Sequence, residues 1–512
     1  MLGFLLYSGT SISCTIYFYF LHHLKTALPQ ANPTTLKDCV LIVLAMLIEE
    51  QAYSVESLYT HILVLIGDVG LTAYYAALSH STMDEKLCLK AFVIAGLKIV
   101  DKNHPNAPFV IGCDDTTIKK FGTHFFGVGT LFDHSSHEKN KYINGHCFVS
   151  CCLKVPVPVP GGYWHYLGIP LGFRLWIPKT GVSKLDIAED IIKEIMKLLG
   201  KDRQVILTCD SWYTRSQLMK LTKQYPNFAL MGNVRSDSVC RKYEPPVVDP
   251  HKKGRKPVHG EKLSLDDYAL TADTLNDFHL GVRKVACSIL KDAPVWAYVS
   301  SPELTSTSKS KRLFYCTIDP LRLAILLEGF ENIPATFNGG KWEMYSPMLI
   351  YAERWILEVT FENMKTFWSL SDYKVRNEQS ILTFINLINL AYTGTVLLPY
   401  LVPQYAKYKN HSPQEIRKIL SQQLREEIDI AKIIIKCKDK NDNSINKNSL
   451  YSILWEALNN RFGKADVIPK TANGRLNCAN NIKTGTTMRE QSDDTMQYDA
   501  DYWHHYWYYH KE

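Results

Sequence analysis

Residues 346–370, SPMLIYAERWILEVTFENMKTFWSL, decide the fold of this chain. Ser346 followed by Pro347 predicts the start of a helix, with serine as the N-cap and proline at the first helical position. Four polar residues would then lie within about 60° of one another on its surface: Tyr351, Arg354, Glu358 and Lys365. An acid, two cations and a phenol on one stripe suit a site that handles a divalent metal and phosphates. The alternative is a solvated helix face, on which Arg354 and Glu358 would form an i,i+4 ion pair in any case.

The composition is that of an ordinary globular protein. Of 512 residues, 46% are hydrophobic and 21% are charged, and the net charge of +7 fits a polyanion partner without requiring one. The thirteen cysteines include no C-x2-C pair. Such an unpatterned set indicates reduced thiols in a cytoplasm and argues against a disulfide framework.

The N-terminal segment, residues 1–27, is apolar and of uncertain status. Gly, Ser and Thr interrupt the run, and no basic region precedes it. A buried helix, or an extension upstream of the natural start, is favoured over a membrane anchor. Residues 28–105 then carry helical periodicity and predict a bundle, which either binds DNA ends or packs on the core.

Residues 106–234 change to a β-prone pattern and predict an α/β core. The run 109–113 leads directly into Asp114, and 205–209 leads into Asp210. Further strands are expected at 145–155, 163–177 and 228–234, with helices at 184–200 and after Asp210. The order is β-β-β-α-β-α-β.

A basic, proline-rich stretch opens residues 235–340, which predict a β-rich insertion. Its clustered cations are either a phosphate-backbone contact or a solvated charge run: Lys252, Lys253, Arg255 and Lys256. Strands are expected at 283–290, 295–300 and 312–318. The core resumes at 341–402, and 403–470 predict helices, of which 413–436 is amphipathic and a candidate dimer contact. We expect a disordered tail at 471–512.

The spacing Tyr-x2-Arg-x3-Glu-x6-Lys resembles the signature helix of the "YREK" group of bacterial insertion-sequence transposases. These are DDE enzymes with a ribonuclease-H-like core, and the predicted strand order is that of such a core. The resemblance covers about residues 105–400, including DDT at 114–116 and CDSWY at 209–213. The family pattern Asp-x-Thr/Ser selects Asp114 over Asp115, because Thr116 follows two residues later.

The resemblance implies a catalytic and metal-binding triad of Asp114, Asp210 and Glu358. Two Mg²⁺ ions, for which Mn²⁺ can substitute, would stabilise the attacking and leaving oxygens of a phosphodiester displacement. Tyr351, Arg354 and Lys365 would grip phosphates, and Trp355 would stack on an extruded base or lie buried.

The expected protein is a DNA transposase that cuts at the ends of an insertion sequence and joins them to target DNA. Its partners would be double-stranded DNA, as terminal repeats and target, and a second copy in the synaptic complex. A membrane partner is not expected, and the location would be the bacterial cytoplasm, at the nucleoid. Three alternatives remain: an inactive transposase-derived DNA-binding protein, a ribonuclease-H-like nuclease without strand transfer, and a membrane-attached protein with such a domain.

Overall fold

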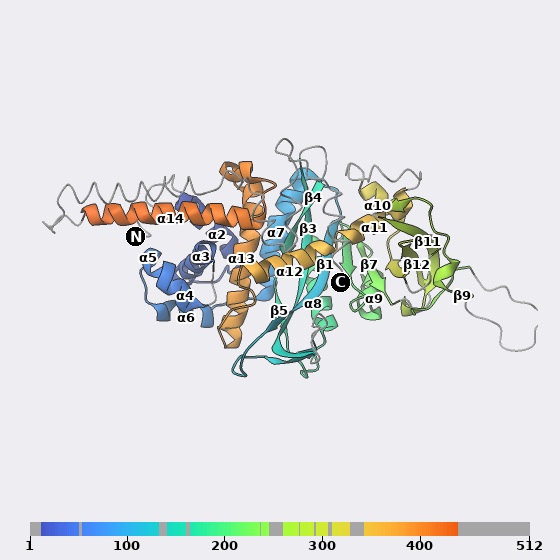
Figure 1. Ribbon diagram of the computed structural model, residues 1–512, viewed down its shortest axis with the longest axis horizontal. Helices are drawn as coiled ribbons and strands as arrows, with labels where there is room; N and C mark the ends of the chain where they lie inside the picture. Colours follow the sequence, from blue (N-terminus) through green and yellow to red (C-terminus); the bar gives the residue numbers. More distant parts are fainter. Residues whose placement is uncertain are drawn as a thin grey trace, which may run out of the picture. The chain divides into compact units, whose positions relative to one another are not determined.

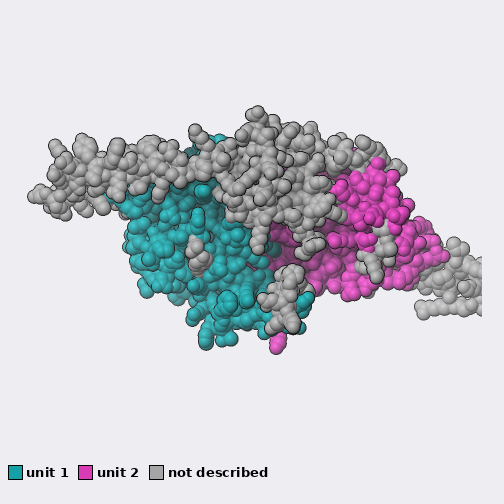
Figure 2. All heavy atoms as spheres, viewed as in Figure 1, with its two compact units in different colours: residues 1–95, 117–146, 361–495 teal, residues 96–116, 147–360, 496–512 magenta. Residues whose placement is uncertain are grey.

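The computed structural model describes residues 12–50, 54–132, 141–159, 164–235, 237–244, 260–275, 277–290, 293–305, 310–327 and 342–438. The chain forms two compact units (Figure 2). Unit 1 comprises residues 1–95, 117–146 and 361–495, and unit 2 comprises 96–116, 147–360 and 496–512. Three parts of the chain lie outside the described residues: residues 1–11, the cluster Lys252, Lys253, Arg255 and Lys256, and residues 439–512, which include the end of the predicted helical region and the expected tail.

The fold is a mixed α/β fold with a large mixed sheet flanked by helices, which confirms the predicted class (Figure 1). In the described residues the sheet has thirteen strands, in the order β2-β3-β1-β6-β7-β13-β12-β11-β8-β9, while β4 and β5 pair with β3 and β10 pairs with β11. The strands are β1 (Phe109–Lys119), β2 (Gly129–Phe132), β3 (Tyr142–Pro158), β4 (Trp164–Pro170), β5 (Arg174–Trp176), β6 (Val205–Cys209), β7 (Phe228–Val234), β8 (Cys240–Lys242), β9 (Lys262–Leu263), β10 (Thr274–Leu275), β11 (Phe278–Cys287), β12 (Ala293–Ser301) and β13 (Arg312–Cys316).

The centre of the sheet is parallel and its margins are antiparallel. β1, β6 and β7 run parallel, whereas β4 and β5 are antiparallel to β3. The strands of the predicted insertion do not form a separate layer, because β13 pairs antiparallel with β7 and so extends the same sheet. β1 is longer than predicted and continues to Lys119, so Asp114 lies within it. The β-prone residues Thr116 and Ile118 explain the extension.

The helices of unit 2 begin and end at residues that the sequence marks. α8 (Lys184–Leu199) starts at a capping box between Ser183 and Asp186 and ends at Gly200, whose φ of 67° suits glycine. The others are α9 (Ser216–Gln224), α10 (Pro320–Leu326) and the 3-10 helices η2 (Leu265–Asp267), η3 (Ser288–Leu290) and η4 (Trp342–Tyr345). The apolar core of this part draws on β1, β6, β7, β12 and β13 through Val110, Ile206, Met231, Tyr298 and Phe314.

The signature stretch forms two helices, α11 (Ser346–Ala352) and α12 (Trp355–Phe367), instead of the single helix predicted. At the break, Arg354 N donates to Tyr351 O at 2.8 Å and Leu357 N donates to Arg354 O at 3.1 Å, so the chain tightens to an i,i+3 pattern. Ser346 is not an N-cap: its Oγ donates to the carbonyl oxygens of Pro320 and Glu343. Proline does stand in the first turn, as predicted.

Unit 1 is mainly helical and is built around two apolar helices, α3 (Pro33–Ile48) and α13 (Glu378–Leu401). Around them stand α2 (Ile12–Ala27), α4 (Val55–Leu58), the π-helix η1 (Tyr59–Leu63), α5 (Val64–Ile66), α6 (Leu71–Ser79), the 3-10 helix η5 (Pro403–Tyr408) and α14 (Pro413–Lys438), and α7 (Glu85–Asn103) runs through both units. The apolar face of α14 packs inside unit 1, where Ile416, Leu420 and Leu424 are buried. Ile430 of α14 is 43% exposed, so a dimer contact through the end of this helix stays a prediction.

Among the described residues, one helix, α13, is long and apolar enough to cross a membrane, and a bent pair at 55–66 and 71–79 passes the same test together. α13 is 94% buried within the protein, as expected of a core helix. The described part of the N-terminal segment, α2, also packs inside unit 1, with Ile16, Phe20 and Leu24 buried. This burial agrees with the buried-helix alternative for that segment.

Candidate active site

Asp114 and Asp210 lie side by side just past the point where β1 and β6 stop pairing. β1 and β6 are parallel, and the last residues in register are Cys113 and Cys209, so Asp114, which lies within β1, stands beside Asp210, which directly follows β6. Neighbouring strands are about 4.8 Å apart, which brings the two carboxylates together. Burial, and then the charge of Asp210, raise the pKa of Asp114 to about 7. The pair is crowded with negative charge, which a divalent cation would relieve.

Backbone amides hold the carboxylate of Asp210 in place. Its Oδ1 accepts hydrogen bonds from Trp212 N at 2.9 Å and Tyr213 N at 3.0 Å. Asp210 therefore has the hydrogen bonds of a turn residue and also lies beside Asp114. The turn fixes the direction in which the carboxylate points.

α12 brings Glu358 close to β1 and β4, and Gly168 on β4 lets the helix approach. A Cβ at Gly168 would lie 2.2 Å from Thr360 Oγ1, so no other residue fits there without a shift of the helix. A Cβ at Gly112 would touch Leu357, the residue before Glu358, at 3.5 Å. Glu358 sits in the first turn of α12 with its side chain one-third exposed.

Arg354 stands at the break between α11 and α12 and contacts two of the three acids. Its Nη1 lies 3.4 Å from Asp114 Oδ2, and its Nη2 donates to Glu358 Oε1. Its guanidinium also hydrogen-bonds Tyr351, whose ring packs edge-on against Phe314 with 4.9 Å between centroids. Two residues predicted to grip phosphates are therefore engaged with the acids and the core.

Asp115 faces a different set of partners, as expected from strand alternation. Its carboxylate accepts from Lys184 Nζ at 2.6 Å and from the Tyr213 hydroxyl at 3.0 Å. Lys184 also lies 5.2 Å and 5.4 Å from the ring centroids of Trp176 and Trp212. Sequence reasoning missed Lys184, because this lysine is 69 residues from Asp115 and starts an ordinary surface helix.

A fully buried lysine, Lys154, lies behind the two strands that carry the aspartates. Its ammonium donates to Thr208 Oγ1 at 2.9 Å, and Thr208 Oγ1 donates to Ile111 O on β1 at 3.2 Å. Burial lowers the pKa of Lys154 to about 7. No motif marked it, since it sits within an apolar strand.

The remaining predicted residues are placed as follows. Lys365 lies seven residues after Glu358 on α12, about 20° away around the helix. Trp355 begins α12 and is half-buried, a burial that fits either of its predicted roles.

Asp114 and Asp210 fit a divalent cation, since two crowded carboxylates are the oxygen ligands that Mg²⁺ prefers. Glu358 is paired with Arg354. In the part of the chain that the structure describes, no three His, Cys, Asp or Glu side chains converge tightly enough to hold a metal. A third carboxylate ligand would require Glu358 to leave Arg354.

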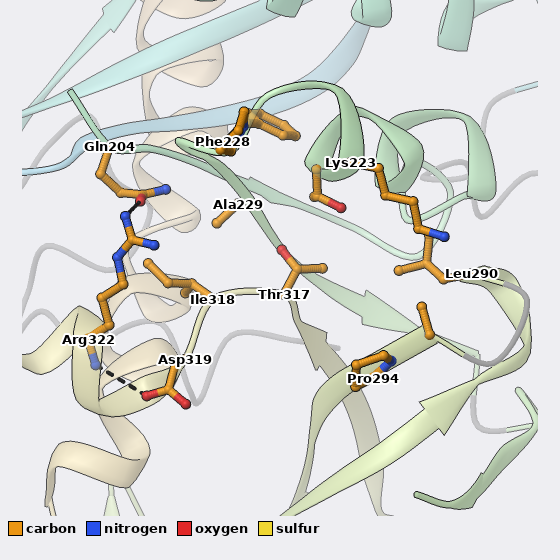
Figure 3. Close-up of a pocket in the computed structure, with 13 residues that line it drawn as sticks. Gln204, Lys223, Phe228, Ala229, Leu290, Pro294, Thr317, Ile318, Asp319 and Arg322 are labelled. Carbon is orange, nitrogen blue, oxygen red and sulfur yellow. Dashed lines mark hydrogen bonds between the residues drawn. The ribbon is translucent and has the colours of Figure 1, made fainter. Parts of the chain in front are cut away.

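A separate pocket of about 260 Å³ lies at the opposite ends of the parallel strands, next to the starts of β6 and β7 (Figure 3). Arg322 donates to Gln204 Oε1 there at 3.1 Å, and Asp319 caps α10. With its one carboxylate used as a helix cap, this pocket does not suit metal-dependent chemistry.

The chain matches the family described as "DDE superfamily endonuclease" over residues 21–284, a range that includes Asp114 and Asp210 and ends before Glu358. The search of curated proteins found no match. Among solved structures, the chain is similar to the cryo-EM structure of the piggyBac transposase synaptic complex with hairpin DNA. The TM-score is 0.41 and the identity 12%, over 86% of this chain and 81% of that chain.

Proposed function

Since this chain belongs to the DDE superfamily endonucleases, we propose that it is a DNA transposase. It would cut DNA at the ends of an insertion sequence and join the 3′-hydroxyl ends to target DNA. Its use of the Tyr-Arg-Glu-Lys pattern, as in the insertion-sequence group that the signature helix resembles, is part of this proposal. The observation that carries it is the register of β1 and β6, which puts Asp114 beside Asp210.

Asp114 and Asp210 would hold the metal. Glu358 would become the third carboxylate ligand after its ion pair with Arg354 breaks. Bound Mg²⁺ or Mn²⁺ supplies Lewis-acid stabilisation of the attacking and leaving oxygens of the phosphodiester. The turn at Asp210 keeps its carboxylate oriented before substrate arrives. Because this carboxylate is already oriented, its side chain does not have to be rearranged when the reaction takes place.

Arg354 would change partners during the reaction. Its guanidinium offers parallel donors that match a phosphate as well as a carboxylate. When a DNA phosphate enters, Arg354 would bind it and release Asp114 and Glu358 for the metal. This exchange would make assembly of the metal site depend on DNA, with Lys365 as a further phosphate contact on the same helix.

The test is metal-dependent cleavage and strand transfer on DNA that carries the flanking terminal repeats. The wild type is compared with Asp114→Ala, Asp210→Ala and Glu358→Gln, and with Asp115→Asn as a matched control next to the site. We expect the three variants to lose both reactions and to keep end binding. Full activity in all three would overturn the site assignment.

Two other functions would give distinct results in the same assay. A transposase-derived DNA-binding protein would bind the ends and cleave nothing. A nuclease would nick DNA without joining ends. We further propose that the active assembly contains two copies and acts at the bacterial nucleoid, which sedimentation of the protein–DNA complex and imaging of a tagged protein would test.

A further inference from the structure

A fully buried lysine of unit 2 connects two strands of the sheet with the first of the two signature helices. Lys154 lies on β3 and is 1% exposed. β1 separates β3 from β6 in the sheet, and Lys154 Nζ donates across it to Thr208 Oγ1 on β6 at 2.9 Å. Lys154 Nζ also donates to the carbonyl oxygen of Ile350 in α11, at 3.5 Å. We call these two hydrogen bonds the Lys154 tether.

The lysine lies on the sheet face that α12 covers. Lys154 is directly opposite Gly168 in the β3–β4 pair, and residues that face each other in this way present their side chains on the same side of the sheet. A Cβ at Gly168 would lie 2.2 Å from Thr360 Oγ1 of α12. Since Lys154 Nζ also contacts Ile350 of α11, the amine lies between the sheet and the signature helices.

The carbonyl that Lys154 binds is the one that the break in the signature stretch separates from its helical partner. In an unbroken α-helix, Arg354 N would donate to Ile350 O in the i,i+4 pattern. Here Arg354 N donates to Tyr351 O at 2.8 Å instead. Ile350 is buried, so water has little access to its carbonyl, and Lys154 supplies a donor to it from another element. The Lys154 tether therefore fits the broken helix and not a continuous one.

The Lys154 tether does not depend on the charge of the lysine. Burial lowers the pKa of Lys154 to about 7, and the titratable groups that act on it more weakly are Glu353, Cys152 and Arg354. The neutral amine keeps two hydrogens, one for each of the two acceptors. Thr208 Oγ1 donates its own hydrogen to a carbonyl of β1 at 3.2 Å and so accepts from the lysine in either state.

We propose that Lys154 is a positioning residue for Arg354. By fixing the end of α11 to β6, the Lys154 tether keeps the break in place. The break in turn directs the Arg354 guanidinium at Asp114 and Glu358. The inference rests on the proposed function in taking these carboxylates as metal ligands, so that loosening the tether makes them more available to a cation.

The first measurement is hydrogen exchange of the full chain in EDTA, read by mass spectrometry of peptides from residues 346–367. Lys154→Met removes the donor, and Thr208→Val removes the acceptor on β6 while the lysine remains. Both variants should lose amide protection around the break, because an element that has lost its anchor opens more often. Ser150→Ala is the matched control. It removes another fully buried hydrogen bond of β3, to Gly172 O at 2.6 Å, and should leave these peptides unchanged.

The second measurement separates positioning from a merely structural role. Calorimetry gives the affinity for Mn²⁺, without DNA, of Lys154→Met, Arg354→Met and the double variant. Lys154→Met should tighten binding about three-fold, because the guanidinium is loosened and not removed. The double variant should bind Mn²⁺ as Arg354→Met does, since a tether that acts through Arg354 has no effect once the guanidinium is gone.

Unchanged exchange at the break in Lys154→Met and Thr208→Val, or the same loss of protection in Ser150→Ala, would overturn the inference. So would Mn²⁺ affinity that stays at the wild-type value in Lys154→Met, or effects that add in the double variant, which would show that the lysine acts by its own charge. If Lys154→Met does not fold, Thr208→Val decides in both measurements. If protection is lost as expected while neither the wild type nor any variant binds Mn²⁺ or cleaves DNA, the proposed function alone fails.

Discussion

Neutralising Asp114 should stabilise the protein at alkaline pH. Its carboxyl is buried beside Asp210, and the folded-state pKa is raised from 3.8 to about 7. Between these values the folded state holds a proton that the unfolded state has lost. The stability that this proton contributes is full below pH 4 and is lost as the pH rises through 7.

The size of the effect follows from the pKa difference. At about 1.36 kcal/mol per pKa unit, moving from 3.8 to about 7 penalises the charged form by about 4 kcal/mol. The side chain is only 24% exposed, so solvent screening removes a modest part of this value. Asn keeps the acceptor for Asp115 N, which bonds Asp114 Oδ1 at 2.8 Å. Asp114→Asn should therefore exceed the wild type by about 2–4 kcal/mol at pH 8 and match it near pH 4.

The assay is urea unfolding in EDTA, followed by tryptophan fluorescence at several pH values. Asp115→Asn is the control, and it should be less stable than the wild type at pH 8. The Asp115 carboxylate lies 2.6 Å from Lys184 Nζ, and this ion pair should stabilise the folded state. Added Mn²⁺ should narrow the gap between Asp114→Asn and the wild type, since the cation relieves the repulsion. If Asp114→Asn is no more stable than the wild type at pH 8, the two aspartates are not crowded and the reasoning fails.

Three further predictions concern single contacts. Arg354→Met removes a charge beside Asp114 and Glu358, and Mn²⁺ binding without DNA should tighten at least about five-fold by calorimetry; unchanged affinity would contradict the proposed exchange. Gly394→Ala places a Cβ 2.2 Å from the Phe20 ring and should lower the melting temperature, at a cost of about 1–3 kcal/mol; a rise would contradict the close α2–α13 crossing. Arg417→Met frees the carbonyls of α3 that Arg417 binds and should cost about 1–3 kcal/mol in urea unfolding, and equal stability would show that water replaces it.

The sequence was most informative where local pattern and burial agree. β6 and β7 begin and end where the apolar runs 205–209 and 228–234 do, and α8 spans 184–199 against the predicted 184–200. Most of the order of strands and helices followed from the alternation of the two periodicities. β2 was not predicted, and the single strand expected at 163–177 is divided into β4 and β5. The same reading failed at the signature stretch, where helical spacing predicted one helix and the chain breaks at Arg354. Spacing cannot reveal a break that depends on what Arg354 contacts.

The sequence by itself determined the α/β class, most of the element order and the position of Asp210 directly after β6, because these depend on residues close together in the chain. Only the tertiary structure decided that Arg354 contacts Asp114 and that Lys184 pairs with Asp115. Those contacts join residues 69 or more apart. Their formation depends on which strands pair and how closely a helix packs, and glycines such as Gly168 set that approach only once the sheet exists.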